Sequence, residues 1–167
     1  LVLANRGSSA ATFSLAYVES LDAASAGPRG SAVFTLAAGE QRIVPDALDA
    51  LRSLGVSIPP GGSHAGAVRA TVSGVPLDRV YAGARTAAAA PAGGQFGLFT
   101  SAMAPGEEAV TEAYLYGLRA DATNRTNVAV VNAGAPGDGS VTLELVAYDG
   151  DASGAARGDP EVVTLAE

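Results

Sequence analysis

The chain of 167 residues contains no cysteine, no tryptophan and no lysine, and its single histidine is His64. Without cysteine it has neither disulfides nor thiolate ligands for a metal. All ten basic residues are arginines, scattered singly between Arg6 and Arg157, and they face 17 acidic residues, which gives a net charge of −7. An acidic chain without a basic stripe is a poor candidate for binding nucleic acid or an anionic lipid surface.

Long hydrophobic runs are also missing. No stretch approaches the roughly 20 apolar residues that a membrane helix needs, and the start lacks the charged and apolar regions of a signal peptide. Hydrophobic residues nevertheless make up 48% of the chain and charged residues 16%, which is too apolar for a solvated coil. We therefore expect a globular protein without a membrane span. Because the chain opens inside an apolar run, we also expect the natural polypeptide to extend upstream of Leu1.

The last forty or so residues repeat the first forty. Residues 1–7 (LVLANRG) are similar to residues 128–134 (VAVVNAG), and residues 32–37 (AVFTLA) are similar to residues 161–166 (EVVTLA). The offsets are 132 − 5 = 127 and 165 − 36 = 129, so a two-residue insertion in the intervening loop keeps both matches in one alignment. Self-similarity of this kind is typical of modular arrays, which serve reach, display and adhesion more often than chemistry.

The repeat leaves two domain organisations open. In the first, residues 1–167 form one compact β-sandwich unit, in which residues 128–167 repeat residues 1–39. In the second, residues 1–106 are a first module and residues 107–167 a partial second module. Four predicted strands after Ala113 are too few to enclose a core of their own, so we expect them to pack onto the first module or to dock as a partial sandwich.

Short apolar segments rich in Val, Thr, Leu, Phe and Tyr alternate with Gly, Pro, Ser and Asp clusters, which predicts strands. The predicted strands cover residues 1–4, 12–19, 32–37, 41–44, 65–73, 79–86, 95–100, 113–118, 127–132, 140–148 and 161–165. Residues 87–90, within an alanine-rich loop, could extend a strand or form a helical turn. Residues 45–55 (PDALDALRSLG) instead space three leucines as in a helix, with Pro and Asp before them and Gly after. This short helix is expected to cover one end of the sandwich.

Alternation with period two predicts which strand residues face the core. Val141, Leu143 and Leu145 are expected to point inward, and so are Phe13 and Leu15 in the first copy. Residues 128–131 are apolar without a break, which indicates a central strand covered on both faces.

One loop carries oxygen-bearing side chains at the spacing of a calcium loop. Asp149, Asp151 and Ser153 occupy positions 1, 3 and 5, and Gly154 occupies position 6. The twelfth position, where a bidentate glutamate is wanted, is Pro160. These three residues are therefore a candidate calcium site, and an Asp/Gly-rich turn explains the same letters by turn chemistry alone. No other cofactor is expected.

Other short motifs are weaker. Ser63 beside His64 is distantly similar to the nucleophile elbow of serine hydrolases, but Ala65 stands where the second Gly is required, and a strand follows instead of a helix. Residues 157–159 (RGD) spell a tripeptide that integrins recognise, and residues 124–126 (NRT) have the form of a glycosylation sequon. The tyrosines, with Tyr114 and Tyr116 foremost, could form a sugar-binding surface, although core or edge packing is the commoner role.

Residues 125–132 (RTNVAVVN), together with residues 116–119 (YGLR) and 141–148 (VTLELVAY), resemble a repeat of the RTN-V-x-x-V-N type. This repeat recurs in secreted and surface proteins of bacteria as an immunoglobulin-like sandwich module of uncharacterised role. The resemblance implies that residues 42–46 with Leu51 match the short helix of the family, and that residues 80–85 match a late strand. It brings no functional residues with it.

The sequence thus predicts an all-β, antiparallel, immunoglobulin-like β-sandwich with one short helix and an internal duplication. We expect a non-catalytic structural or adhesive module of a larger exported bacterial protein, located outside the cell or in the cell envelope. The alternative is an accessory domain that binds a carbohydrate or a protein, with calcium as a possible requirement. Expected partners are neighbouring modules of the same polypeptide and a protein or glycan, with no nucleic acid.

Overall fold

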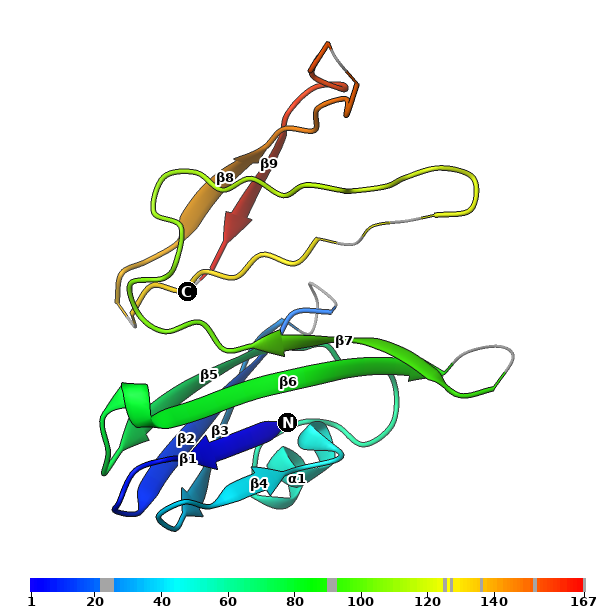
Figure 1. Ribbon diagram of the computed structural model, residues 1–167. Helices are drawn as coiled ribbons and strands as arrows, with labels where there is room; N and C mark the ends of the chain where they lie inside the picture. Colours follow the sequence, from blue (N-terminus) through cyan, green and yellow to red (C-terminus); the bar gives the residue numbers. More distant parts are fainter. Residues whose placement is uncertain are drawn as a thin grey trace. The chain divides into compact units, whose positions relative to one another are not determined.

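The computed structural model describes residues 1–21, 26–89, 93–124, 126, 128–135, 137–151 and 153–166. Its contacts divide the chain into two compact units, Leu1–Gly106 (unit 1) and Glu107–Glu167 (unit 2), and each is described by itself. Strand accounts for 39% and helix for 7% of the residues, and every sheet is antiparallel (Figure 1). The predicted all-β, sandwich-like fold with a short helix is therefore confirmed.

Unit 1 contains a four-stranded sheet in the order β4-β1-β6-β7. Its strands are β1 (Val2–Asn5), β4 (Gln41–Ile43), β6 (Val80–Ala89) and β7 (Gln95–Ser101). A short 3-10 helix, η1 (Leu77–Arg79), leads into β6. Strand β6 runs three residues past its predicted end, through the first part of the alanine-rich segment, and pairs with β7 along that length.

The second sheet of unit 1 has the order β3-β2-β5. It consists of β2 (Ala11–Glu19), β3 (Gly27–Leu36) and β5 (Gly66–Ser73). Strand β3 starts five residues before its predicted start, because Gly27, Pro28 and Gly30 continue the ladder opposite the end of β2. Gly30 has a φ of +115° beside the register shift at Tyr17 and Val18, a conformation that favours glycine.

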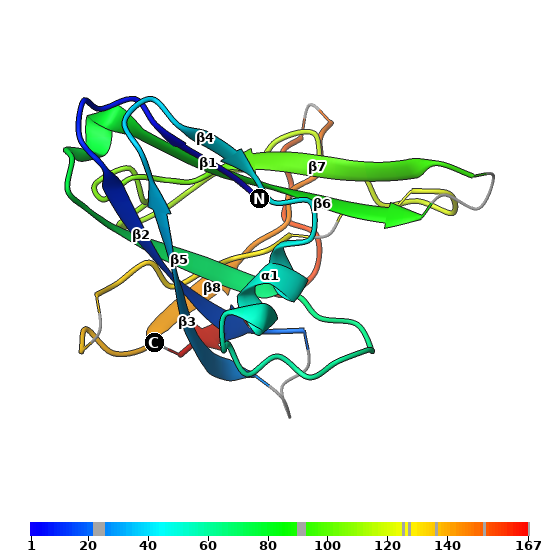
Figure 2. The same cartoon turned by 90° about the horizontal axis from the view of Figure 1, so that it is seen from below.

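The two sheets face each other and enclose the core of unit 1 (Figure 2). The inward residues of β2 are all buried, as alternation predicted for Phe13 and Leu15, which are 0% and 1% exposed. Leu3 of β1 and Leu36 of β3 complete the contact between the sheets. Burial of such side chains contributes about 1.5–3 kcal/mol each, so this stripe is the main source of stability for unit 1.

The predicted helix forms as α1 (Ala47–Ser53). Asp46 caps its start, because its side chain accepts a hydrogen bond from the Asp49 amide, and Gly55 follows its end with a φ of +96°. Leu51 is 1% exposed and joins the core together with Val56 and Ile58. Helix α1 lies on the side where the two sheets diverge (Figure 2), which agrees with the predicted cover at one end.

Unit 2 contains one two-stranded sheet, β8 (Val141–Leu145) with β9 (Glu161–Leu165). An isolated bridge between Tyr148 and Ala156 continues the hairpin. The inward orientation predicted for β8 gives only partial burial: Leu143 is half-buried, whereas Val141 and Leu145 are 41% and 38% exposed.

Two predicted strands of unit 2 are wrong. Residues 113–118 and the described part of 127–132 form no strand, and Val128 and Val131 of the supposed central strand are 47% and 63% exposed. The matching segment of unit 1, β1, has β4 on one edge and β6 on the other. No such partners occur within the described part of unit 2, and a strand without them leaves its backbone groups unpaired.

No helix in the described part of the chain is long and apolar enough to cross a membrane.

Candidate functional site

The most distinctive polar site of unit 1 is the side chain of Asn5, at the end of β1. Asn5 is 1% exposed, and its Nδ2 donates hydrogen bonds to the carbonyl oxygens of Ser9, Leu36 and Ala37 at 2.7, 3.2 and 2.9 Å. Its Oδ1 accepts a hydrogen bond from the Gly7 amide at 2.9 Å. One buried side chain therefore fixes the turn after β1, the start of β2 and the end of β3. We call this arrangement the asparagine clamp.

Close steric contacts explain why glycine occupies the third position of the Asn-x-Gly sequence. A Cβ atom on Gly7 would lie 2.8 Å from Cγ1 of Val75 and 3.0 Å from Oδ1 of Asn5. Distances this short would force the turn away from the clamp. Local contacts therefore explain both the asparagine and the glycine of the repeated motif.

Unit 2 contains a second asparagine clamp. Nδ2 of Asn132 donates to the carbonyl oxygens of Gly139 and Ala166 at 2.9 and 3.3 Å. Oδ1 of Asn132 accepts a hydrogen bond from the Gly134 amide at 3.0 Å. The same side chain thus binds the same three parts of the chain as in unit 1.

The hairpin registers of the two copies also agree. In unit 1, Ala11 pairs with Leu36 and Phe13 with Phe34; in unit 2, Val141 pairs with Leu165 and Leu143 with Val163. These pairs superpose with offsets of 141 − 11 = 130 and 165 − 36 = 129.

The clamp partners obey the same offsets, because 139 − 9 = 130 and 166 − 37 = 129. The internal repeat is therefore present in the hydrogen bonds and the strand register as well as in the amino-acid sequence.

A buried carboxylate, Glu19, ends the inward stripe of β2 and is 1% exposed. Its oxygens accept hydrogen bonds from the Ala65 amide at 3.1 Å, the Leu21 amide at 3.4 Å and the Tyr17 hydroxyl at 3.2 Å, and His64 Nδ1 lies 2.9 Å away. Burial alone would raise the pKa of Glu19, but the bonds from His64, Ala65, Leu21 and Tyr17 outweigh it and lower the pKa to about 2. Glu19 is thus held as an anion.

The pKa of Tyr17 shifts in the opposite direction. Burial and the neighbouring charge of Glu19 raise the pKa of Tyr17 to about 12, because both disfavour the phenolate. Tyr17 therefore stays a neutral hydrogen-bond donor to Glu19.

Both ring nitrogens of His64 contact acceptors within the fold. Nδ1 faces Glu19, and Nε2 lies 2.9 Å from the carbonyl oxygen of Gly61. Both contacts are satisfied together only when each nitrogen carries a hydrogen. The geometry directs the ring to Glu19 and Gly61, and it fastens the loop before β5 to the end of β2.

Sequence reasoning missed Glu19, although a signal for it exists. Continuing the period-two pattern from Phe13 and Leu15 through Tyr17 places Glu19 on the inward face. A carboxylate at a core-facing position calls for a partner, and His64 is the only histidine in the chain.

The candidate calcium residues lie in the loop between β8 and β9, where their side chains form hydrogen bonds within the loop. Oδ1 of Asp151 accepts a hydrogen bond from the Ser153 amide at 2.8 Å, and hydrogen bonds from Ser153 lower the pKa of Asp151. Oδ1 of Asp149 accepts a hydrogen bond from Nε of Arg157. No group of three or more acidic or histidine side chains gathers for a metal among the described residues. The calcium site stays a prediction, and calcium would have to compete with Arg157 for Asp149.

Asp149 also occupies the place of Glu19 in the repeat, since 149 − 19 = 130, the offset that relates β8 to β2. Glu19 is the last residue of β2, whereas Asp149 follows the end of β8 by four residues, next to the bridge between Tyr148 and Ala156.

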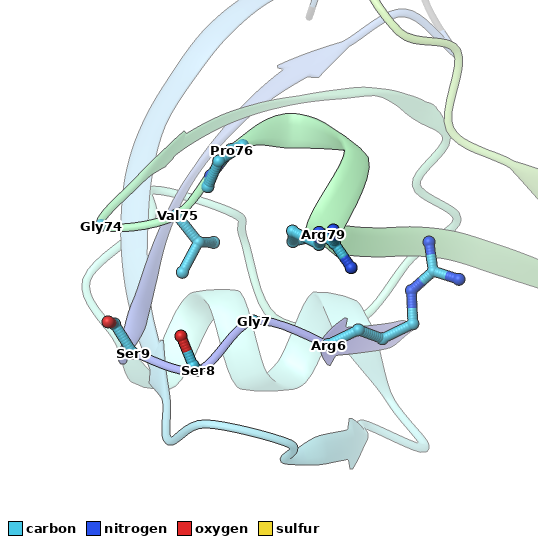
Figure 3. Close-up of a pocket in the computed structure, with 8 residues that line it drawn as sticks. All are labelled: Arg6, Gly7, Ser8, Ser9, Gly74, Val75, Pro76 and Arg79. Atoms are coloured by element: carbon cyan, nitrogen blue, oxygen red, sulfur yellow. The ribbon is translucent and has the colours of Figure 1, made fainter.

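The turn after β1 borders a shallow pocket of about 390 Å³. Figure 3 shows Arg6 and Arg79 on one side and Ser8 and Ser9 on the other. Nη2 of Arg6 donates to the Asp78 carbonyl oxygen at 3.2 Å, and Nε of Arg79 lies 3.6 Å from the Asp78 carboxylate. The two cations are therefore already engaged at the rim of the pocket.

The remaining motif residues have local partners. Arg157 of the RGD tripeptide pairs with Asp149. The amide group of Asn124, in the sequon, donates to both carboxylate oxygens of Asp121. Tyr114 and Tyr116 stack with their ring centroids 6.4 Å apart and their planes 23° apart, and they are 64% and 86% exposed.

No family model matches the chain, and neither a curated protein nor a solved structure matches it.

Proposed function

We propose that this chain is a non-catalytic structural module of a larger exported bacterial protein, built as an array of immunoglobulin-like sandwiches. The observation that carries the proposal is the asparagine clamp, which occurs twice with the same hairpin register. Repetition of a whole supersecondary unit is the mark of arrays whose role is reach and display. The Glu19–His64 pair supports a structural role, because its atoms bind the backbone of the fold.

The strand order of unit 1 determines how tension would act on the module. Val2 at the start of β1 and Ser101 at the end of β7 are both paired with Gly83 of β6. From Gly83, β1 runs toward Val80, whereas β7 arrives from the opposite end of β6. The start of β1 and the end of β7 therefore lie at the same level on opposite edges of β6, so tension between them acts across the strands and opens their hydrogen bonds one after another.

Single-molecule stretching tests this role. The absence of native cysteine allows unique handles, with one Cys placed ahead of Leu1 and a second in place of the exposed Met103. Unfolding between these handles is expected as one cooperative event that releases about 340–370 Å of chain, at 3.3–3.6 Å per residue.

The matched control moves the second handle to Pro45, next to the end of β4. Because Val2 pairs with Ile43, these handles also lie opposite one another across the strands, and unfolding at a similar force is expected. Extension through several small events with either pair of handles would contradict a cooperatively folded structural module.

A ligand-binding accessory domain is the second candidate, and the exposed stack of Tyr114 and Tyr116 favours it. Aromatic faces of this kind bind sugar rings and apolar side chains. Saturable binding to a glycan panel that is lost in the double variant Tyr114→Ala, Tyr116→Ala would support it. Tyr148→Ala is the control, because Tyr148 is also exposed, at 62%. An equal loss in the control, or no binding with and without calcium, would remove this candidate.

A further inference from the structure

Strand β2 of unit 1 has a neighbour on each side, with β3 on one edge and β5 on the other. Strand β8 matches β2 in clamp and register, yet within the described residues it pairs with β9 alone. Its other edge therefore presents backbone groups at the place where β2 binds β5. Exposed edges of this kind are templates for pairing with another strand.

We propose that the open edge of β8 binds an antiparallel strand with the residue pattern of β5, supplied by a further module. The inference rests on the proposed array and names a partner for this edge. In unit 1, β5 brings the sequence GAVRATVS to the edge of β2, and this pattern defines the chemistry of the partner.

The repeat fixes the register of the pairing. In unit 1, Phe13 pairs with Val72 and Tyr17 with Val68. The offset of 130 transfers these positions to Leu143 and Ala147. In unit 1, Leu15 pairs with Ala70 of β5, so the partner strand also places an apolar residue opposite Leu145, which is now 38% exposed.

The carboxylate of Asp149, which follows β8, also fits a partner of this kind. In unit 1, the segment entering β5 brings His64 Nδ1 and the Ala65 amide to the carboxylate of Glu19. The equivalent carboxylate of unit 2, Asp149, has a side chain that is 31% exposed and is paired with Arg157. A strand of β5 type, preceded by His-Ala, presents a ring nitrogen and a backbone amide to Asp149.

The experiment appends residues 64–73 (HAGAVRATVS) to the full chain. A linker of about 15 Gly and Ser residues spans roughly 20 Å on average and can extend far enough to bring the copy to the Asp149 end of β8. Amide hydrogen exchange in β8 is measured by NMR, because a newly paired edge protects its amides. The matched control carries Val68→Asp and Val72→Asp in the appended copy only.

We expect alternate amides of β8 to exchange about tenfold more slowly with the native copy than with the control, and cross-strand contacts to join Leu143 to the copied Val72. Asp149→Asn should reduce this difference. Equal exchange with both copies would overturn the proposal, and so would contacts in another register. Protection that rises with concentration in the unmodified chain would also overturn it, because a second copy of the chain would then cover β8. None of these results involves the stretching of unit 1, so the two proposals fail separately.

Discussion

The hairpins β2–β3 and β8–β9 share a register and an asparagine clamp but differ in burial. Phe13 in the first hairpin is 0% exposed, whereas its counterpart Leu143 is half-buried and Leu145 is 38% exposed. The first hairpin faces a second sheet and is flanked by β5, and the second is not flanked in this way within the described residues of unit 2. Local sequence is therefore enough to specify the hairpin, while its burial depends on strands from elsewhere in the module.

The largest difference between the two copies is expected in the core. Phe13→Ala should destabilise unit 1 by about 4 kcal/mol, because a large buried side chain leaves a cavity. Leu143→Ala should cost unit 2 only about 1 kcal/mol, because half-burial limits what is lost. Urea unfolding followed by NMR signals of each unit measures both values. Equal costs would show that the second hairpin is as well packed as the first.

Loss of the asparagine clamp should also destabilise unit 1 more than unit 2. Asn5→Ala removes the donor from one buried and two partly buried carbonyl groups and should cost about 3 kcal/mol. Asn132→Ala, at a half-buried site, should cost about 1 kcal/mol. The unit-resolved urea experiment applies again, with Asn5→Asp and Asn132→Asp as variants that keep the shape but lose the donor. A harmless Asn5→Ala would refute the structural role of the clamp.

Acid should weaken unit 1 through Glu19. The pKa of Glu19 falls from the ordinary value of 4.5 to about 2 on folding, so its contribution is fully present above pH 4.5 and is lost as the pH falls toward 2. Glu19→Gln should lower stability at neutral pH and flatten the pH dependence between these limits. Thermal unfolding across this range, compared between the two proteins, isolates Glu19 from other carboxylates. Parallel curves would contradict a stabilising anion at this position.

The smallest effect is expected at the counterpart of Glu19. Asp149→Asn removes an exposed ion pair with Arg157 and should change stability by about 0.5 kcal/mol or less. The same variant tests the predicted calcium site. If millimolar calcium binds the folded state, it raises the unfolding midpoint of the native chain and not that of Asp149→Asn. An equal response in both proteins would exclude Asp149 as a ligand.

The sequence predicts the hairpins and the helix well because their signals are local. Alternation of small and apolar side chains marks β2 and β8, and Asp46 with Gly55 brackets α1. The strands predicted at 113–118 and 127–132 do not form in the described residues, because strand formation needs a partner. Val128 to Val131 carry the right residue types, but the described part of unit 2 offers no equivalent of β4 or β6.

The polar sites were less accessible to sequence reasoning. The repeated Asn-x-Gly letters were visible, but their role depends on Leu36 and Ala37, some thirty residues away. Glu19 and His64 meet because β5 pairs with β2 across 45 positions of sequence. Such contacts follow from topology, which no spacing rule within a short motif encodes.

Unit 2 repeats the clamped hairpin of unit 1 in the same backbone register. NMR contacts in the full chain test it most directly. The account predicts cross-strand contacts that place Leu143 opposite Val163 and Val141 opposite Leu165, with the side-chain amide of Asn132 beside Ala166. A hairpin shifted by one residue, or an Asn132 amide far from Ala166, would contradict it.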